Sequence, residues 1–396
     1  MNILVANLGS TSFKFRLFRF AGEDATLVAR GGHERVTDHG KAIDDCLAEL
    51  KAAGHVRSVG DLHGVGFKTV LGRDLTGCVP ADERVIAALE GFRELAPAHN
   101  PPYAEGIRRF QEKLPGVPLV ALFETAFYQW MPEAATRYAV PETWYRAGVR
   151  RHGFHGASHK FVAERSAELL GRPDIAERVR RLYQVGPGSV NSARPRLRVI
   201  SCHLGGSSSI TGICDGVAIG TSMGLSPQSG LPQNNRVGDL DSAAVPYVLK
   251  TFGQPLAEIE RQMTKESGLL GLSGVANDVR DIRGAAAQGN PRARLALDVF
   301  NHSARHWIGA LHLELGGCEA IVFTAGIGEN DPELRAAILR DLHELGVVLD
   351  PAKNAALRGA EGEISAPTSR VKVLVIPANE ELVVARETLR SIAARN

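Results

Sequence analysis

The chain has 396 residues, a length that corresponds to two or three domains at roughly 150 residues per domain. Hydrophobic residues make up 44% and charged residues 23% of it, values that exclude collagen-like and wholly disordered chains. The 46 lysines and arginines nearly balance the 44 acidic residues, for a formal net charge of +2. A chain this close to neutrality has no global attraction for nucleic acid or an anionic membrane, so any anion site must be local.

The five cysteines are scattered and contain no CxxC pair, which argues against a disulfide framework or a structural zinc site. The first residues carry no basic leader segment, and no run approaches the roughly 18 consecutive apolar residues of a membrane-spanning helix. We therefore expect a soluble protein of the cytoplasm, with neither nucleic acid nor a membrane among its partners.

The first predicted elements form a hairpin. Residues 3–6 are an apolar, β-prone run, residues 7–12 are a turn of Gly, Ser and Thr, and residues 13–18 alternate as a half-buried strand does. The pattern returns in the second half of the chain, with strands at 199–202 and 210–214. The matching pairs in the two turns are Leu8-Gly9 with Leu204-Gly205 and Thr11-Ser12 with Ser207-Ser208. This repeat predicts two related domains that face each other across a cleft.

Helical patterns lie between and after these hairpins. Apolar residues recur at helical spacing in 41–53 and 295–315, and Ser158 is predicted to cap a helix that ends at Gly171. Residues 173–195 are basic and contain Gly-Pro-Gly, which we interpret as a surface loop or a hairpin insertion. Because strands and helices alternate throughout, the sequence predicts an α/β fold.

The last part of the chain predicts an anion site. A buried strand at 319–324 is followed by a glycine turn at 326–330, and Asp331 then caps a helix that has Pro332 in its first position. A strand, a glycine turn and a helix N-terminus in this order suit a phosphate or a nucleotide. A final strand at 371–376 leads into a terminal helix.

Several familiar catalytic motifs do not occur in the sequence: it has no GxxxxGK[ST], no HExxH and no GxGxxG. The two Gly/Ser turns offer amides and hydroxyls to phosphate oxygens. Single candidates stand in rigid or glycine-rich loops: His99 between prolines, His155 between glycines, and Arg236. Each of them could equally be an ordinary turn, helix-entry or surface residue, so the pattern leaves both interpretations open.

Two acidic residues, Glu124 and Glu380, each follow a predicted strand. Carboxylates at strand ends beside a cleft could hold Mg²⁺ through water, which is the usual binding mode of this ion. The alternative interpretation is a pair of solvated turns.

Taken together, these motifs resemble the acetate kinase family of the sugar kinase, heat-shock chaperone and actin superfamily. The resemblance extends over nearly the whole chain, and the motifs follow the family's order. They read NLGSTSFKF at 7–15, FETAF at 123–127, GFHG at 153–156, SCHLG at 201–205, FTAGIGEN at 323–330 and PANEE at 377–381.

The resemblance implies two actin-like (ribonuclease H-like) domains related by duplication, with a cleft between them. The N-terminal domain would span 1–150, with the terminal helix 382–396 packing back on it, and the nucleotide-binding domain would span 151–381. The implied activity is reversible phosphoryl transfer from ATP to acetate, giving acetyl phosphate and ADP. The implied cofactor is Mg²⁺, and the implied assembly is a homodimer.

The resemblance also assigns roles to residues. The implied catalytic residues are Arg236, which would neutralise the transferring phosphoryl group, His155, His99 and Glu124. The implied acid-binding residues are Lys68, Val70, Phe154 and Pro227. The implied nucleotide-binding residues are Ser10, Ser12, Lys14, His203, Gly205, Asp278, Val279, Arg280, Gly326, Ile327, Gly328 and Asn330. The implied metal-binding residues are Asn7 and Glu380.

The chain departs from the family's pattern at four places. Lys68 stands for an arginine and loses its bidentate fork, while Glu124 stands for an aspartate and is one methylene longer. Gly206 replaces an asparagine beside the phosphates, and Ala98 replaces a leucine, which would enlarge the acyl pocket. Two alternatives therefore stay open: a kinase for propionate, butyrate or another longer acid, and a nucleotide-binding relative with little turnover.

The chemistry of such a transfer places few demands on acid–base groups. A short carboxylate is already ionised at pH 7, because carboxyl pKa values lie near ~4, so the nucleophile needs no general base. The difficulty is to bring two anions, the carboxylate and the nucleotide phosphate, together in line. Cations and N–H donors must offset their repulsion. We expect Arg236, Lys68, His155 and Lys14 to do so in a direct in-line transfer.

Overall fold

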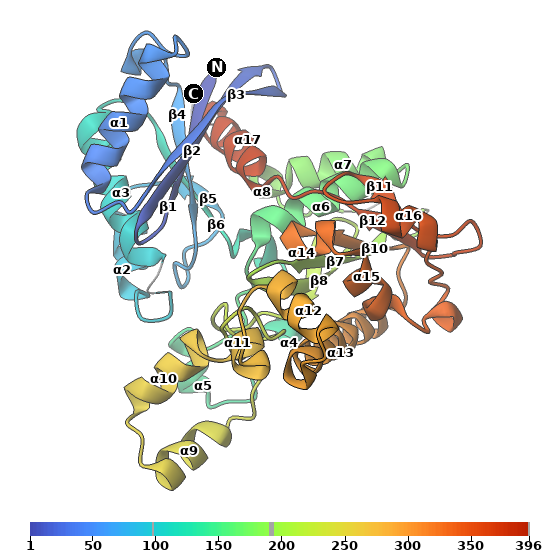
Figure 1. Ribbon diagram of the computed structural model, residues 1–396. Helices are drawn as coiled ribbons and strands as arrows, with labels where there is room; N and C mark the ends of the chain where they lie inside the picture. The colour runs from blue at the N-terminus through green and yellow to red at the C-terminus, as the bar shows by residue number, and fades with distance from the viewer. Residues whose placement is uncertain (97–98, 190–193, 395–396) are drawn as a thin grey trace.

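The computed structural model describes residues 1–96, 99–189 and 194–394, and each half of the chain builds a six-stranded sheet (Figure 1). The first sheet has the order β3-β2-β1-β4-β6-β5. Its strands are β1 (Asn2–Leu8), β2 (Ser12–Ala21), β3 (Asp24–Glu34), β4 (Gly64–Thr69), β5 (Cys78–Pro80) and β6 (Leu119–Phe123). The second sheet has the order β11-β12-β10-β7-β8-β9. Its strands are β7 (Arg198–Leu204), β8 (Ser208–Cys214), β9 (Val217–Thr221), β10 (Ala320–Thr324), β11 (Gly362–Glu363) and β12 (Lys372–Val375).

The two sheets follow one plan. In each, the first three strands form an antiparallel meander, the fourth lies parallel to the first, the sixth lies parallel to the fourth, and the fifth is an antiparallel edge. The equivalent hairpins close at Leu8 opposite Phe13 and at Leu204 opposite Ser208. The predicted α/β fold with two duplicated domains is therefore confirmed.

The first sheet is covered on both faces. Helices α1 (His39–Ala52), α2 (Glu83–Gly91) and α3 (Asn100–Lys113) pack on one face, and α17 (Glu380–Ala393) packs on the other (Figure 1). Aromatic contacts dominate the first face, where the rings of Phe67 and Phe110 meet edge to face with centroids 5.3 Å apart. On the opposite face Val383 and Val384 share a buried cluster with Ile3.

The second sheet is covered in the same way. Helices α11 (Gly268–Ser273), α12 (Val279–Ala287), α13 (Pro291–Leu315) and α15 (Pro332–Leu339) pack on one face. Helices α6 (Gly156–Leu169) and α7 (Pro173–Arg180) pack on the other. The shorter elements are η1 (Val59–Asp61), η2 (Ala126–Tyr128), α4 (Glu133–Thr136), α5 (Glu142–Arg146), α8 (Leu182–Val185), α14 (Ala325–Asn330), η3 (His343–Leu345) and α16 (Pro351–Ala356). Helices α9 (Ala244–Phe252) and α10 (Leu256–Lys265) project from the body (Figure 1).

A buried ion pair joins the two halves of the molecule. Lys160 Nζ of α6 lies 3.0 Å from Glu387 Oε1 of α17, and both side chains are almost fully buried. Arg390 adds a second contact to the same carboxylate, 2.8 Å from Oε1. Because both charges have a partner of opposite sign within hydrogen-bonding distance, the ion pair fixes α17 against α6 and leaves no unpaired charge in the core.

The predicted cap of α6 is wrong. The helix begins at Gly156, and His155 occupies the cap position in the left-handed region with φ 60°, so Ser158 lies inside the first turn and is fully buried. The early start has a steric reason. A Cβ at position 156 would lie 2.2 Å from the carbonyl oxygen of Glu124, so only glycine allows α6 to approach β6 this closely.

Two further local predictions are wrong. Much of 173–195, expected to be a loop or a hairpin, is helical in α7 and α8, because Ile175, Ala176 and Val179 recur at helical spacing and are buried. The expected glycine turn at 326–330 lies within the short helix α14. The predicted cap at Asp331 is confirmed, since its side chain accepts a hydrogen bond from Leu334 N.

None of the five cysteines forms a disulfide bond. Among the described residues, no helix combines the length and the apolar character that crossing a membrane requires.

Candidate active site

A cavity of about 500 Å³ lies between the two halves of the molecule. The first sheet contributes the ends of β1, β4 and β6, and the second half contributes the residues before α6 and the long loop that follows β9. The predicted site residues that line this cavity are Asn7, Lys68, Val70, His99, Glu124, Phe154, His155, Pro227 and Arg236. The predicted acid-binding and catalytic residues are thus brought together; their roles stay predictions.

Lys68 links two carboxylates at this cavity. Its Nζ forms an ion pair with Glu380 and lies 3.2 Å from Glu124 Oε1. Burial disfavours the charge of Lys68, but the two carboxylates outweigh it and hold the pKa of the amine well above its ordinary value. The two departures from the family's pattern, a lysine and a longer carboxylate, therefore meet in one ion pair.

The two carboxylates titrate in opposite directions. Burial, followed by repulsion from Glu380, raises the pKa of Glu124 despite the nearby Lys68. Burial also disfavours the charge of Glu380, but Lys68 and His203 outweigh it, so the pKa of Glu380 is lowered. The cluster thus favours the ionised form of Glu380 and disfavours that of Glu124, unless a further cation binds.

The oxygens of this cluster fit a hydrated divalent cation. Glu124 Oε2 is buried without a hydrogen-bond partner, and Asn7 Oδ1 accepts a hydrogen bond from Tyr103 OH at 2.8 Å. Within the described ranges, no group of three or more His, Cys, Asp or Glu side chains is placed to hold a metal by itself. An ion bound by Glu380 and Asn7, with Glu124 near it, would complete its shell with water and phosphate oxygens, as Mg²⁺ commonly does.

Three histidines form a group beside the cavity, in which His159 and His203 are buried and His155 is half-buried. The rings of His155 and His203 stack with centroids 4.1 Å apart and planes 18° from parallel, and His159 lies next to both. Burial and then the neighbouring His203 lower the pKa of His155 well below its ordinary value. Burial likewise lowers the pKa of His203 to about 4. These imidazoles are therefore neutral at pH 7.

His99 lies at the start of α3, directly before Asn100. The buried amide of Asn100 anchors this corner, since its Nδ2 donates to the carbonyl oxygens of Leu71 at 2.9 Å and Leu89 at 3.0 Å. Burial, then Arg236 and Lys68, lower the pKa of His99 to about 4, so it too is neutral. The adjacent Ala98, expected to enlarge the acyl pocket, lies outside the described residues.

Arg236 is a cation without a matching anion. Its Nη1 donates to Pro227 O and to Gln233 Oε1, each at 3.3 Å, and it forms no ion pair with any residue in the described ranges. Burial lowers the pKa of its guanidinium, yet an arginine keeps its charge at neutral pH. A half-buried guanidinium held only by neutral oxygens is suited to a phosphate or carboxylate ligand.

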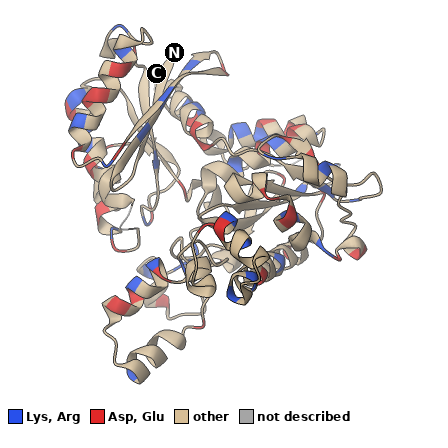
Figure 2. Cartoon of the chain, viewed as in Figure 1, with Lys and Arg blue, Asp and Glu red and all other residues tan. Residues whose placement is uncertain are grey.

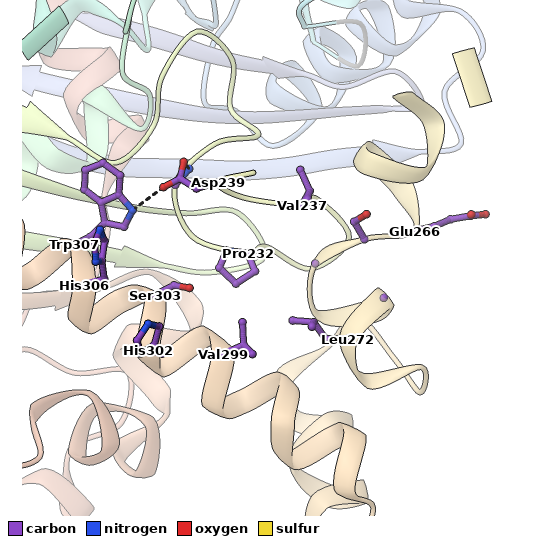
Figure 3. Close-up of a pocket in the computed structure, with 14 residues that line it drawn as sticks. Pro232, Val237, Asp239, Glu266, Leu272, Val299, His302, Ser303, His306 and Trp307 are labelled. Atoms are coloured by element: carbon purple, nitrogen blue, oxygen red, sulfur yellow. Dashed lines mark hydrogen bonds between the residues drawn. The ribbon is translucent and has the colours of Figure 1, made fainter. Parts of the chain in front are cut away.

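The loop that carries Arg236 is anchored from behind. Asp239 Oδ1 accepts from Gly230 N at 2.8 Å, and Asp239 Oδ2 accepts from Trp307 Nε1 of α13 at 3.2 Å (Figure 3). A separate cavity of about 550 Å³ lies on this side, lined by Pro232 and Val237 of the loop and by Val299, His302 and Ser303 of α13 (Figure 3). The loop is thus fixed by its rear contacts while Arg236 lines the cavity between the halves.

A second cavity of about 720 Å³ adjoins the first. Gly206 and Asn234 line both cavities, so a long ligand can extend from one into the other. The predicted nucleotide-binding residues in its wall are Gly205, Asp278, Val279, Arg280, Gly326, Ile327 and Asn330. Asp278 caps α12 and is paired with Arg280 at 2.6 Å, so this arginine is already neutralised in part.

The remaining predicted nucleotide residues lie elsewhere. Lys14 lines a neighbouring cavity of about 430 Å³ that also reaches Asn7, and its Nζ pairs with Glu34 at 3.2 Å. None of these three cavities is lined by Ser10, Ser12, Gly328 or His203.

Sequence reasoning missed several polar residues at the site. Tyr103, Asn234, Asn235 and Asn277 line the cavity between the halves, and Arg283 and Arg358 line the second one. Asn234 and Asn235 had a usable signal, because they directly precede Arg236 in the same loop. Tyr103 had none, since it reads as an apolar position of an amphipathic helix.

Comparisons with known proteins agree with this arrangement. The model of the acetokinase family matches residues 2–186 and 182–386. The chain is 43% identical over 410 residues to the acetate kinase of Geobacillus kaustophilus, with 98% of each chain covered. The crystal structure of Porphyromonas gingivalis acetate kinase superposes with a TM-score of 0.87 at 32% identity, with 99% of each chain covered.

A propionate kinase is also similar. The crystal structure of a propionate kinase from Francisella tularensis superposes with a TM-score of 0.82 at 31% identity and covers 98% of this chain and 99% of its own. Since the family model matches both halves and a relative above 40% identity extends over nearly the full length, this chain belongs to the acetokinase family.

Proposed function

We propose that the protein is an acetate kinase, which transfers the γ-phosphoryl group of ATP to acetate and forms acetyl phosphate and ADP, reversibly. The full-length similarity to acetate kinases supports the activity. The observation that carries the proposal is Arg236, a guanidinium without an anionic partner among the described residues, in the cavity that adjoins the glycine-lined nucleotide cavity.

The reaction is a direct displacement. An acetate oxygen attacks the γ-phosphorus, the bond from that phosphorus to the β–γ bridging oxygen breaks, and ADP leaves with the electron pair. The acid is already ionised, so no proton has to be removed. An isotopically chiral γ-phosphoryl group should therefore be transferred with inversion, and retention would exclude a single displacement.

The residues of the cavity act by position and charge. Arg236 binds the oxygens of the transferring group, and Lys68 offsets the charge of the acid. Val70, Phe154 and Pro227 supply the apolar wall for the methyl group of acetate. His155 and His99, both neutral, contribute hydrogen bonds rather than charge. Glycines of the second cavity let the nucleotide approach the backbone closely.

The proposed cofactor is Mg²⁺, held by Glu380 and Asn7 with Glu124 near it. The ion supplies charge neutralisation on the nucleotide phosphates. The unpartnered Glu124 Oε2 supports this assignment. The chain's own part is to keep the carboxylates fixed through Lys68 and the amide of Asn7 through Tyr103.

The test is to trap acyl phosphate with hydroxylamine in the presence of ATP and Mg²⁺, across a panel of acids and phosphoryl donors. We expect hydroxamate from acetate with the highest kcat/KM of the series. A higher kcat/KM with propionate or butyrate would move the assignment to a longer-chain kinase. No hydroxamate from any acid would leave a nucleotide-binding protein with little turnover.

The proposed assembly is a homodimer in the cytoplasm. The projecting helix α9 supports the dimer, because it has no buried residue and exposes Tyr247 and Phe252, which are 64% and 66% exposed. Lys250 is the one charged residue of α9, so the helix is almost uncoloured in the charge view (Figure 2). Light scattering should give twice the chain mass, and Tyr247→Glu with Phe252→Glu should reduce it to one.

A further inference from the structure

We propose that Ser201, His159 and Ser209 form a hydrogen-bonded chain that fixes the tautomer of His155, so that Nε2 of His155 carries the hydrogen and offers it to the cavity. The proposal deepens the proposed function, on which it rests for the role of His155. Ser201, Ser209 and His159 are positioning residues in it, because they act through His155.

The chain is continuous and fully buried. Ser201 Oγ of β7 lies 2.8 Å from His159 Nδ1, and His159 Nε2 lies 2.8 Å from Ser209 Oγ of β8. Ser209 Oγ in turn lies 2.8 Å from His155 Nδ1. Ser201, Ser209 and His159 are each 0% exposed, while His155 lines the cavity between the halves. With Nδ1 engaged, Nε2 is the nitrogen of His155 that remains for a ligand.

Two directions of hydrogen bonding are conceivable along this chain. A neutral imidazole has one N–H and one lone pair, and a serine hydroxyl has one hydrogen to donate. The first direction has Ser201 donating to His159 and Ser209 donating to His155, which leaves the hydrogen of His155 on Nε2. The second direction has His155 donating through Nδ1, and it leaves a bare lone pair on Nε2.

The far end of the chain selects the first direction. Within the described ranges, Ser201 Oγ has no hydrogen-bond partner besides His159. In the second direction His159 would donate to Ser201, and the hydroxyl hydrogen of Ser201 would be buried without an acceptor, which is unfavourable. In the first direction every hydrogen of the chain has an acceptor. Burial keeps both imidazoles neutral, as this count requires.

A parallel arrangement serves the stacked partner ring. Ser158 Oγ, also fully buried, lies 2.8 Å from His203 Nδ1 and has no other hydrogen-bond partner within the described ranges. By the same count Ser158 donates, and the hydrogen of His203 lies on Nε2. Ser158 thus has a hydrogen-bonding role inside the first turn of α6 that does not depend on capping the helix.

The direction of the chain matters for catalysis. Charge gathers on the oxygens of the transferring group, and a donor aimed at them stabilises the transition state, while a lone pair repels them. Because the imidazole is already in the donor form, no proton has to move during the reaction. The chain thereby makes His155 a neutral donor beside the two cations Arg236 and Lys68.

The experiment is long-range ¹H–¹⁵N spectroscopy of the full chain labelled on histidine nitrogens, with His155 assigned from its absence in His155→Gln. We expect a protonated Nε2 and an unprotonated Nδ1 for His155 in the unaltered protein. A protonated Nδ1 would overturn the proposal. The spectrum is read without substrate, so it stands even if the hydroxamate assay were to reject the proposed activity.

Variants test whether Ser201 is the cause. Ser201→Ala should release the constraint and give a mixture of both His155 tautomers, with kcat falling to roughly half as the competent fraction falls and KM nearly unchanged. Ser201→Cys, close in size but a poor donor, should behave alike if the alanine variant fails to fold. Ser201→Thr keeps the hydroxyl and should keep one tautomer. Ser158→Ala, the matched control, should alter the His203 signals only. A single unchanged tautomer in both Ser201→Ala and Ser201→Cys would overturn the proposal.

Discussion

Arg236 is the residue whose surroundings say most about the ligand. Two neutral oxygens hold its guanidinium, and the described residues offer it no carboxylate. A charge in this situation is stabilised when an anion arrives, and most strongly when that anion gathers charge during the reaction.

Replacing Arg236 should therefore act on the chemical step. We expect Arg236→Ala to lower kcat by ~10²–10⁴, the range for loss of a principal transition-state donor. Arg236→Lys should recover only part of this loss, because an ammonium lacks the bidentate fork. Initial rates of hydroxamate formation measure both variants, and a kcat near that of the unaltered protein would remove Arg236 from the mechanism.

We expect the loss of the Lys68 charge to weaken the binding of acetate but not the binding of Mg²⁺. Lys68→Met removes the positive charge between Glu124 and Glu380, so the KM for acetate should rise about tenfold, a change of ~1.4 kcal/mol. The Mg²⁺ concentration for half-maximal rate should not rise, because the carboxylates lose a competing cation. Lys68→Arg is the matched control that keeps the charge. A rise in the Mg²⁺ requirement of Lys68→Met would contradict the expected separation.

At the residue scale, the sequence predicted which residues form the site better than it predicted which residues hydrogen-bond to them. Arg236, His155, His99 and Lys68 were expected at one site, and they line one cavity. The partners that orient them were not foreseen: Tyr103, Ser201 and Ser209 look like ordinary strand or helix positions in one dimension. Their use depends on which strands become neighbours, and hydrogen-bond partners so far apart leave no local pattern.

The Arg236 loop is hydrogen-bonded to its surroundings at many points, and Asp239 makes two of these contacts at its rear. Asp239 receives hydrogen bonds from Gly230 N within the loop and from Trp307 of α13. These bonds hold the backbone on either side of Arg236 to one helix.

Loss of this anchor should affect activity more than stability. We expect Asp239→Ala to lower kcat/KM about tenfold through misplacement of Arg236. Thermal unfolding should shift little, because Asp239 is exposed. Asp241→Ala is the control, since Asp241 is a nearby exposed residue that bonds Ala243 N. Equal effects of the two substitutions would contradict a specific anchoring role.

At the element scale, segments with regular hydrophobic spacing were predicted well, but helix boundaries that depend on tertiary contacts were not. The two hairpins, the helix at 295–315 and the cap at Asp331 are found as expected. The start of α6 was misplaced because Ser158 resembles a cap, while the real start depends on the close approach of Gly156 to Glu124. A glycine chosen for contact with a distant strand carries no local signal.

The molecule as a whole contains five neutral histidines that are buried or half-buried. Burial lowers the pKa of His99, His152 and His203 to about 4, and of His155 and His159 well below the ordinary value. Between about pH 6.5 and 4 the unfolded chain therefore binds protons that the folded chain does not. Glu124, with a raised pKa, acts in the opposite direction but is one group against five.

Stability should consequently fall as the pH is lowered from about 6.5 towards 4, by up to about 1.4 kcal/mol per pH unit for each histidine. Denaturant midpoints measured at pH 7.5, 6.5 and 5.5 test this. His152→Asn should reduce the slope, whereas the exposed His343→Gln should leave it unchanged. A midpoint independent of pH over this range would refute the expected linkage.

At the largest scale, the duplication was predictable because its two turns repeat in sequence, and the shared strand order shows it directly. The domain boundary near 150 and the dimer stay predictions. The site lies where the two duplicated halves of the chain meet, so the sequence of neither half alone predicts all of its residues.

The position of α17 has a consequence for biosynthesis. One apolar face of the first sheet, including Ile3 and Val5, is packed by a helix that follows every other element in the chain. While the ribosome is still at work, that face stays uncovered although its strands were made early, and such surfaces invite aggregation. The nascent polypeptide thus depends on a late-emerging segment to cover this face of the first sheet.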